Sequence, residues 1–125
     1  MRTLALVAVL LMARAAVAEP SAEQAAYAKA KPVFAKYCAS CHTKDGAKAT
    51  AKKLDHFDMT TYPFGGHHAM TMATTIRKVL AIGGGKPTMP ANKKGAVKGD
   101  ELALIAAWAD AFEAAHKGDS KHHHH

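Results

Sequence analysis

Two cysteines and a histidine with fixed spacing are the residues best suited to chemistry in this sequence. Cys38, Cys41 and His42 form a C-x-x-C-H motif, and the chain has no other cysteine. Two thiols at this spacing can form thioethers with the two vinyl groups of one porphyrin, and the adjacent imidazole can bind its iron. The motif therefore predicts covalent attachment of one haem c, with His42 as the proximal iron ligand.

A structural zinc site or a redox dithiol would use the same cysteines. A zinc site usually needs two further ligands at short spacing, but the chain has no second cysteine pair, and His67 and His68 are adjacent. A thioredoxin-like dithiol should follow a strand of a βαβ unit, and the sequence contains no such pattern. Both alternatives are therefore less favoured than haem attachment.

A second axial ligand for the iron is expected from the second half of the chain. Met89 lies in a loop bounded by prolines and preceded by three glycines, where a thioether could be held at a fixed distance from the iron. His67 or His68 is the alternative ligand, and this pair could instead contact a haem propionate or be exposed at the start of a helix. Weaker candidates for propionate contacts are Tyr62, Arg77 and Lys86.

Helical patterns surround these residues. Residues 19–36 are rich in good helix formers, with Ser21 as an N-cap and Pro32 as a point where the helix could break or begin. Apolar residues at three- and four-residue steps predict a helix over 67–82 and a last helix from a cap at Asp100. Segment 52–59 is expected to be a short helical turn or irregular. Because no strand pattern is convincing, the sequence predicts an all-α fold.

The motif, the Met89-Pro90 loop and the last helix together resemble class I cytochromes c, over roughly residues 34–112. The resemblance implies a small fold in which the N- and C-terminal helices cross and loops wrap one haem. It also implies that Met89 is the distal ligand. Phe34 and Trp108 are expected at the helix crossing or in the haem pocket, together with Tyr62.

Two features depart from the pattern of that family. Ala30 stands where the family often has glycine at the helix crossing. The Gly-Pro that usually follows the haem histidine is also absent, since residues 45–48 contain no proline. The proline carbonyl commonly accepts a hydrogen bond from the proximal imidazole, so a different carbonyl must accept it here.

The first 18 residues have the features of a secretory signal peptide. A positive start at Arg2 precedes a short apolar run, and Ala16-Val17-Ala18 matches a cleavage site. We therefore expect a signal peptide over 1–18, one domain over 19–117 and a flexible tail over 118–125, whose histidines are native or part of a tag. An uncleaved anchor helix is the alternative at the N-terminus. Export suits thioether formation, which requires a site outside the reducing cytoplasm.

The positive charge of the chain could form a solvated surface, a docking face for an acidic redox partner or a nucleic-acid-binding surface. The formal net charge is +7, and its lysines are spread along the chain, which suits electrostatic steering to an acidic redox partner. No nucleic-acid recognition motif is present. The sequence thus predicts a monomeric periplasmic electron carrier rather than an enzyme, with no stable membrane insertion after signal cleavage. The alternative is a haem enzyme or a small-ligand-binding haem protein, with a labile or histidine-ligated sixth position.

Overall fold

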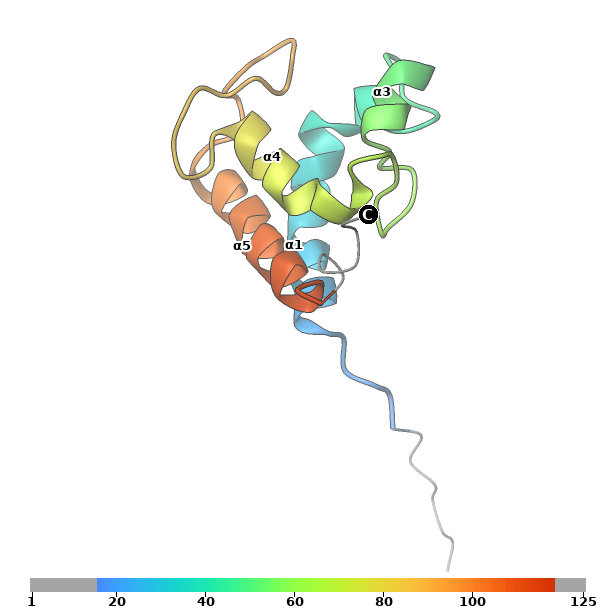
Figure 1. Cartoon of the computed structure of the whole chain (residues 1–125), viewed down its shortest axis with the longest axis vertical. Helices are drawn as coiled ribbons and strands as arrows, with labels where there is room; N and C mark the ends of the chain where they lie inside the picture. The colour runs from blue at the N-terminus through green and yellow to red at the C-terminus, as the bar shows by residue number, and fades with distance from the viewer. Residues whose placement is uncertain (1–15, 119–125) are drawn as a thin grey trace, which may run out of the picture.

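Helices joined by loops make up the described part of the chain (Figure 1). The computed structural model describes residues 16–118, so most of the expected signal peptide and all but the first residue of the expected tail lie outside it. Within 16–118 the only strand-like pairing is an isolated antiparallel bridge between Asp58 and Gly65. The predicted all-α fold is confirmed. The elements are α1 (Ala22–Tyr37), α2 (Ala39–His42), α3 (Ala51–His56), η1 (Ala69–Thr71), α4 (Met72–Leu80) and α5 (Gly99–Ala115).

Helix α1 delivers the cysteine motif. The Ser21 hydroxyl accepts a hydrogen bond from Gln24 N at 3.2 Å, and the Gln24 side chain accepts one from Ser21 N at 3.0 Å, which together form a capping box. Pro32 neither breaks the helix nor begins one, so both expectations for it are wrong. It is exposed within α1, and the helix continues to Tyr37.

The crossing of α1 and α5 forms the centre of the core. Phe34 and Trp108 are buried, and their rings meet edge to face with centroids 5.2 Å apart. Ala30 and Ala109 have no exposed surface and belong to the same cluster. Helix α5 begins at Gly99 after an N-cap at Lys98, so the expected Asp100 cap is wrong by two residues. Asp100 instead lies in the first turn, where its carboxylate interacts favourably with the positive end of the helix dipole.

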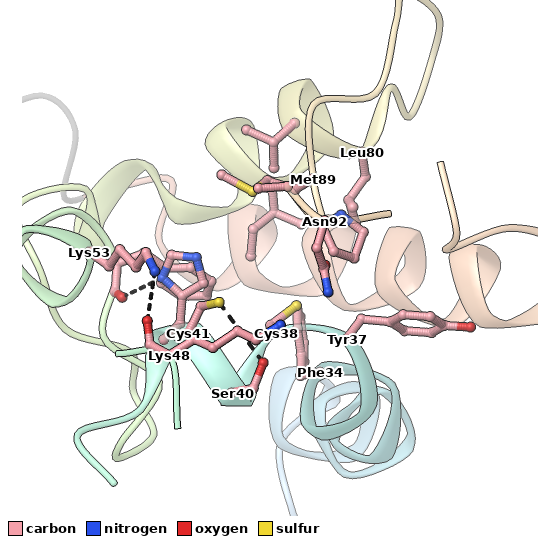
Figure 2. A pocket seen from close by; sticks show the side chains of 16 residues that line it. Phe34, Tyr37, Cys38, Ser40, Cys41, Lys48, Lys53, Leu80, Met89 and Asn92 are labelled. Carbon is pink, nitrogen blue, oxygen red and sulfur yellow. Dashed lines mark hydrogen bonds between the residues drawn. The ribbon is translucent and has the colours of Figure 1, made fainter. Parts of the chain in front are cut away.

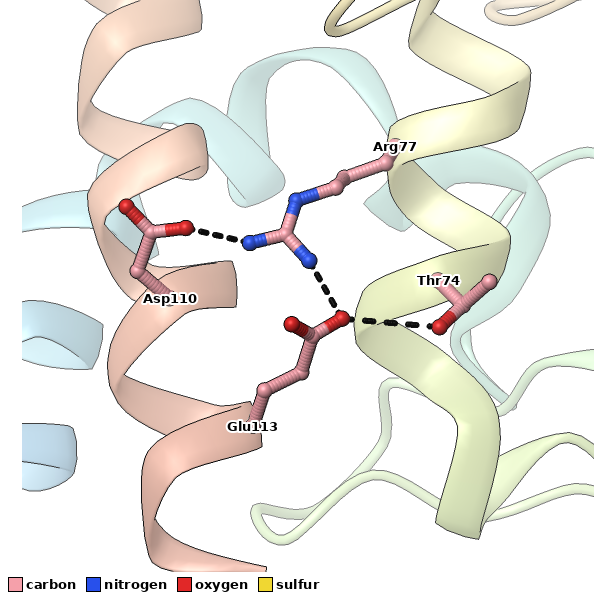
Figure 3. A network of polar contacts seen from close by, with 4 residues as sticks. All are labelled: Thr74, Arg77, Asp110 and Glu113. Atoms are coloured by element: carbon pink, nitrogen blue, oxygen red, sulfur yellow. Dashed lines mark hydrogen bonds and ion pairs between the residues drawn. The ribbon is translucent and has the colours of Figure 1, made fainter. Parts of the chain in front are cut away.

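Helix α4 packs on α5 but starts later than the sequence predicts. The 3₁₀ turn begins at Ala69 and the α-helix at Met72, rather than at His67. Before Met72 the backbone bonds are those of three-residue turns, from Ala69 N to Gly66 O at 3.1 Å and from Thr71 N to His68 O at 3.0 Å, while His67 N donates to Asp55 O of α3 at 2.7 Å. In Figure 3 the Arg77 guanidinium bridges from α4 to Asp110 and Glu113 of α5.

Over residues 16–118, no helix combines the length and the apolar character needed to cross a bilayer.

Candidate haem-binding site

A cavity of about 250 Å³ lies between the first two helices, α4 and the loop after α4 (Figure 2). Its walls are largely apolar, and they bring together residues that are far apart in the sequence. In Figure 2, Met89 and Leu80 border the cavity on the side of α4, and Cys38 and Cys41 border it on the side of α2. Among the predicted site residues, those that line the cavity are Phe34, Cys38, Cys41, His42 and Met89.

The turn of α2 places the two cysteines on one side of the chain. Cys38 N donates to Phe34 O at 2.9 Å, and His42 N donates to Cys38 O at 3.0 Å, so Cys38 caps the end of α1 and the start of α2. The following loop folds closely onto this turn at Gly46, where an added Cβ would lie 2.5 Å from Ser40 O. Only glycine fits there, and this requirement was not recognised in the sequence.

A backbone carbonyl orients His42. Its Nδ1 lies 3.0 Å from Phe57 O. A carbonyl can only accept a hydrogen bond, so Nδ1 carries the proton and Nε2 keeps its lone pair for a metal. The Phe57 ring packs against the imidazole with centroids 5.0 Å apart. This is the carbonyl that the sequence could not identify.

The surroundings of Cys38 favour an uncharged sulfur. Burial, together with the nearby charge of Cys41, raises the pKa of the Cys38 thiol to about 12. A thioether carries no charge, so burial costs it no hydration free energy of an ion. The position therefore suits a covalent attachment better than a reactive thiolate, which needs an electropositive setting.

The loop that carries Met89 is tied to the end of α4. Thr88 N and Met89 N both donate to Val79 O, at 2.9 and 3.1 Å. The three preceding glycines, 83–85, have left-handed backbone angles with φ between 90° and 125°, which lets the chain turn back toward α4. Met89 is consequently held beside Val79 and Leu80 at the cavity wall.

Tyr62 and Trp108 lie behind the cavity rather than in its wall. Trp108 Nε1 donates to the Tyr62 hydroxyl at 3.0 Å, and this hydroxyl donates to Glu23 Oε1 at 2.5 Å. Burial and the bond to Glu23 raise the pKa of Tyr62. These residues support the helix crossing that positions Phe34. Arg77, a weak propionate candidate, is paired with α5 instead.

A second cavity of about 220 Å³ adjoins the first. The two cavities share His42, Phe57 and Met89 among their lining residues. His56 and His68 line the second cavity, whereas His67 does not. Of the two histidines considered as alternative axial ligands, only His68 therefore borders the site.

The residues present fit a haem attached through C-x-x-C-H. Paired sulfurs, an imidazole with a free Nε2, a thioether and apolar walls meet at one cavity, and together these groups could hold a haem c. A family model described as "Cytochrome C oxidase, cbb3-type, subunit III" matches residues 25–108, a span that holds every lining residue of both cavities. No curated protein and no solved structure matches the chain.

Proposed function

The chain belongs to the cytochrome c family described as cbb3-type cytochrome c oxidase, subunit III, and from this premise we propose that it is a periplasmic electron carrier with one covalent haem c. Cys38 and Cys41 would hold the haem as thioethers, and His42 and Met89 would bind its iron from its two faces. The bound haem supplies an iron that changes between ferrous and ferric and so carries one electron. The protein itself transforms no substrate.

The observation that carries this proposal is the shared cavity of His42 and Met89. The bond from His42 Nδ1 to Phe57 O fixes the ring, and the two bonds to Val79 O fix the backbone at Met89. Ligands held in this way need little rearrangement when the iron changes its charge. A site with both axial positions filled by the protein favours electron transfer over chemistry on a bound substrate.

Charge at the mouth of the cavity supports docking to an acidic partner. Lys48 and Lys53 both line the cavity, and Lys53 Nζ donates to Lys48 O at 2.6 Å (Figure 2). Together with the net charge of +7, they favour encounter with a negatively charged redox protein. The description of the family suggests a terminal oxidase as that partner, with the chain either diffusing to it or serving as its fixed electron-entry module.

The ferric optical spectrum tests the axial ligands. The chain would be expressed in an exporting host with haem-attachment machinery, and we expect a weak far-red band from methionine bound to ferric iron. Met89→Ala should abolish this band, whereas Met70→Ala, at an exposed methionine of η1, should retain it. A band that survives in Met89→Ala would contradict the assignment.

Two further measurements test attachment and export. In Cys38→Ser or Cys41→Ser the alkaline pyridine spectrum should change, because one vinyl group stays unreacted. The mass of the purified protein should correspond to a chain that begins at Glu19 and carries one haem. A chain that retains residues 1–18 would support the anchor alternative instead.

The second cavity favours one alternative function. Because His68 lies beside His42 and Met89, the sixth position could be histidine-ligated or labile, as in a haem enzyme or a protein that binds small ligands. That function predicts rapid binding of carbon monoxide or cyanide to the wild-type protein. The electron carrier predicts slow or weak binding that becomes fast in Met89→Ala.

A further inference from the structure

Three histidine side chains gather at the surface beside the second cavity. His56 ends α3, and His67 and His68 precede η1. One ring nitrogen from each lies within 4.8 Å of the other two. We propose that these residues form a binding site for a divalent transition-metal ion, for which Zn²⁺ is the probe.

The spacing of the imidazoles is close to what such an ion requires. Two nitrogens bound to one Zn²⁺ at 2.0–2.1 Å in tetrahedral geometry are about 3.3 Å apart. The nitrogens of the cluster lie up to 4.8 Å apart, and the ring centroids are 4.5 Å apart for His56 and His67, 4.1 Å for His67 and His68 and 5.7 Å for His56 and His68. His56 and His67 are exposed, so small rotations of their side chains can bring the three nitrogens to one ion. A fourth position would be left to water.

The backbone holds the two segments of the site together before any ion binds. His67 N donates to Asp55 O at 2.7 Å, and Asp58 and Gly65 exchange hydrogen bonds of 3.0 and 2.8 Å. Gly66 makes this approach possible because its φ is 91° and an added Cβ would lie 2.8 Å from the His56 backbone. The loop therefore converges on the end of α3 without help from a ligand, and little backbone ordering remains for the ion to drive.

An outer carboxylate completes the arrangement. Asp55 Oδ2 lies 3.5 Å from His67 Nδ1. Metal-binding histidines commonly direct their second ring nitrogen to a carboxylate, which fixes the ring and strengthens it as a ligand. His67 thus has its Nε2 available for the ion. The set of three imidazoles and a supporting carboxylate suits Zn²⁺ and Cu²⁺ better than Mg²⁺ or Ca²⁺, which prefer oxygen ligands.

The ion would lie next to the redox centre. His56 and His68 line the same cavity as His42 and Met89. A positive charge there disfavours the ferric state, which carries one more positive charge than the ferrous state, so the reduction potential should rise when the ion binds. This consequence rests on the proposed function, whereas binding of the ion does not.

Calorimetric titration of the haem-loaded protein with Zn²⁺ tests the site. The four terminal histidines could also bind metal, so the full chain is compared with a chain that ends at Lys121. We expect the shortened chain to keep one Zn²⁺ site. His67→Ala in that chain should lose it, Asp55→Asn should weaken it by about 10- to 100-fold, and the control His116→Ala should keep it. Circular dichroism verifies that each variant is folded.

The outcomes separate the site from its alternatives. Binding that disappears with the tail, or that persists unchanged in His67→Ala, would overturn the three-histidine site. Conversion of the ferric iron to a high-spin state in His68→Ala would also overturn it, because His68 would then be an iron ligand. Zn²⁺ should raise the haem potential in the shortened chain but not in its His67→Ala variant. If haem fails to attach while Zn²⁺ still binds, the proposed function fails and the metal site stands.

Discussion

The carboxylate of Glu101 joins α5 to a residue of the cavity wall. It accepts a hydrogen bond from the Tyr37 hydroxyl at 2.7 Å and two from Lys36 Nζ at 3.1 and 3.2 Å. The bond from Tyr37, followed by that from Lys36, lowers the pKa of Glu101 below its usual value of 4.5. Tyr37 lines the cavity, and its hydroxyl donates to Glu101. Protonation of Glu101 would therefore weaken a bond that fixes this side chain of the cavity wall.

Glu101→Gln should destabilise the protein in a pH-dependent manner. A lowered folded-state pKa means that the carboxylate contributes stability above pH 4.5, which is lost as the pH falls through the folded-state pKa. The variant should therefore be less stable than wild type at pH 7, and the two should converge under more acidic conditions. Urea denaturation at several pH values measures this. Glu19→Gln, at an exposed residue before α1, serves as the control; an equal loss at all pH values would contradict the explanation.

The functional side chains could be predicted from the sequence to different degrees. Cys38, Cys41 and His42 belong to a motif with few other uses, and Met89 is distinguished by the prolines around it. The structure brings all four to one cavity. The hydrogen-bond acceptor for His42 could not be predicted, because every residue has a backbone carbonyl and only the folded chain selects Phe57. The histidine cluster could not be predicted either, because only the folded chain brings His56 next to His67 and His68.

At the scale of elements, the α1–α5 crossing depends on small side chains. Ala30 is completely buried in the core cluster, at a position where class I cytochromes c, which the chain resembles, often have glycine. One methyl group is therefore accommodated at the crossing. A larger side chain would push the helices apart and displace Phe34, one turn further along α1, from the cavity wall.

Ala30→Leu should accordingly destabilise the protein by about 1–3 kcal/mol, the usual cost of overpacking a core. Ala28→Leu places the same side chain at an exposed position of α1 and should change stability by no more than about 0.5 kcal/mol. Guanidinium denaturation monitored by circular dichroism compares the two. Equal stability of both variants would show that the crossing is looser than described.

The presence of the helices was easier to predict than the residues at which they begin and end. Apolar spacing identified α1, α4 and α5, because each buries one face against another helix. The expected start at His67 was wrong because Ala69 N and Thr71 N bond to carbonyls three residues back rather than four, which apolar spacing cannot reveal. The continuity of α1 through Pro32 depends on the burial of Val33 and Phe34 beside it, a tertiary contribution that outweighs the local preference.

At the scale of the whole molecule, the cavity and the core are continuous. Phe34, Ile76 and Leu80 belong to the buried cluster and also line the cavity. Phe57, Val79 and Met89 line it while remaining partly exposed. A bound haem would cover these last three side chains, so the fold is expected to be complete only with the cofactor in place.

The protein produced without haem should therefore be less stable than the haem-loaded protein. Covering each of the three side chains adds about 1 kcal/mol to the free energy of unfolding. A group that binds only the folded chain stabilises that state further. Thermal unfolding of Cys38→Ser/Cys41→Ser produced without haem, compared with the loaded wild type, measures the difference. Similar melting temperatures would mean that the chain packs fully without its cofactor.

The acceptor for His42 belongs to the main chain, and this affects how the site tolerates mutation. No side-chain replacement at position 57 removes a carbonyl, so an alanine scan would leave the bond between His42 and Phe57 O intact. Only a change in the path of the backbone can break this hydrogen bond. Replacement of Gly66 is one such change, because Gly66 lies against the peptide that joins His56 to Phe57. Replacements at position 57 would thus keep the hydrogen bond that orients His42, although they would remove the ring that packs against its imidazole and lines both cavities.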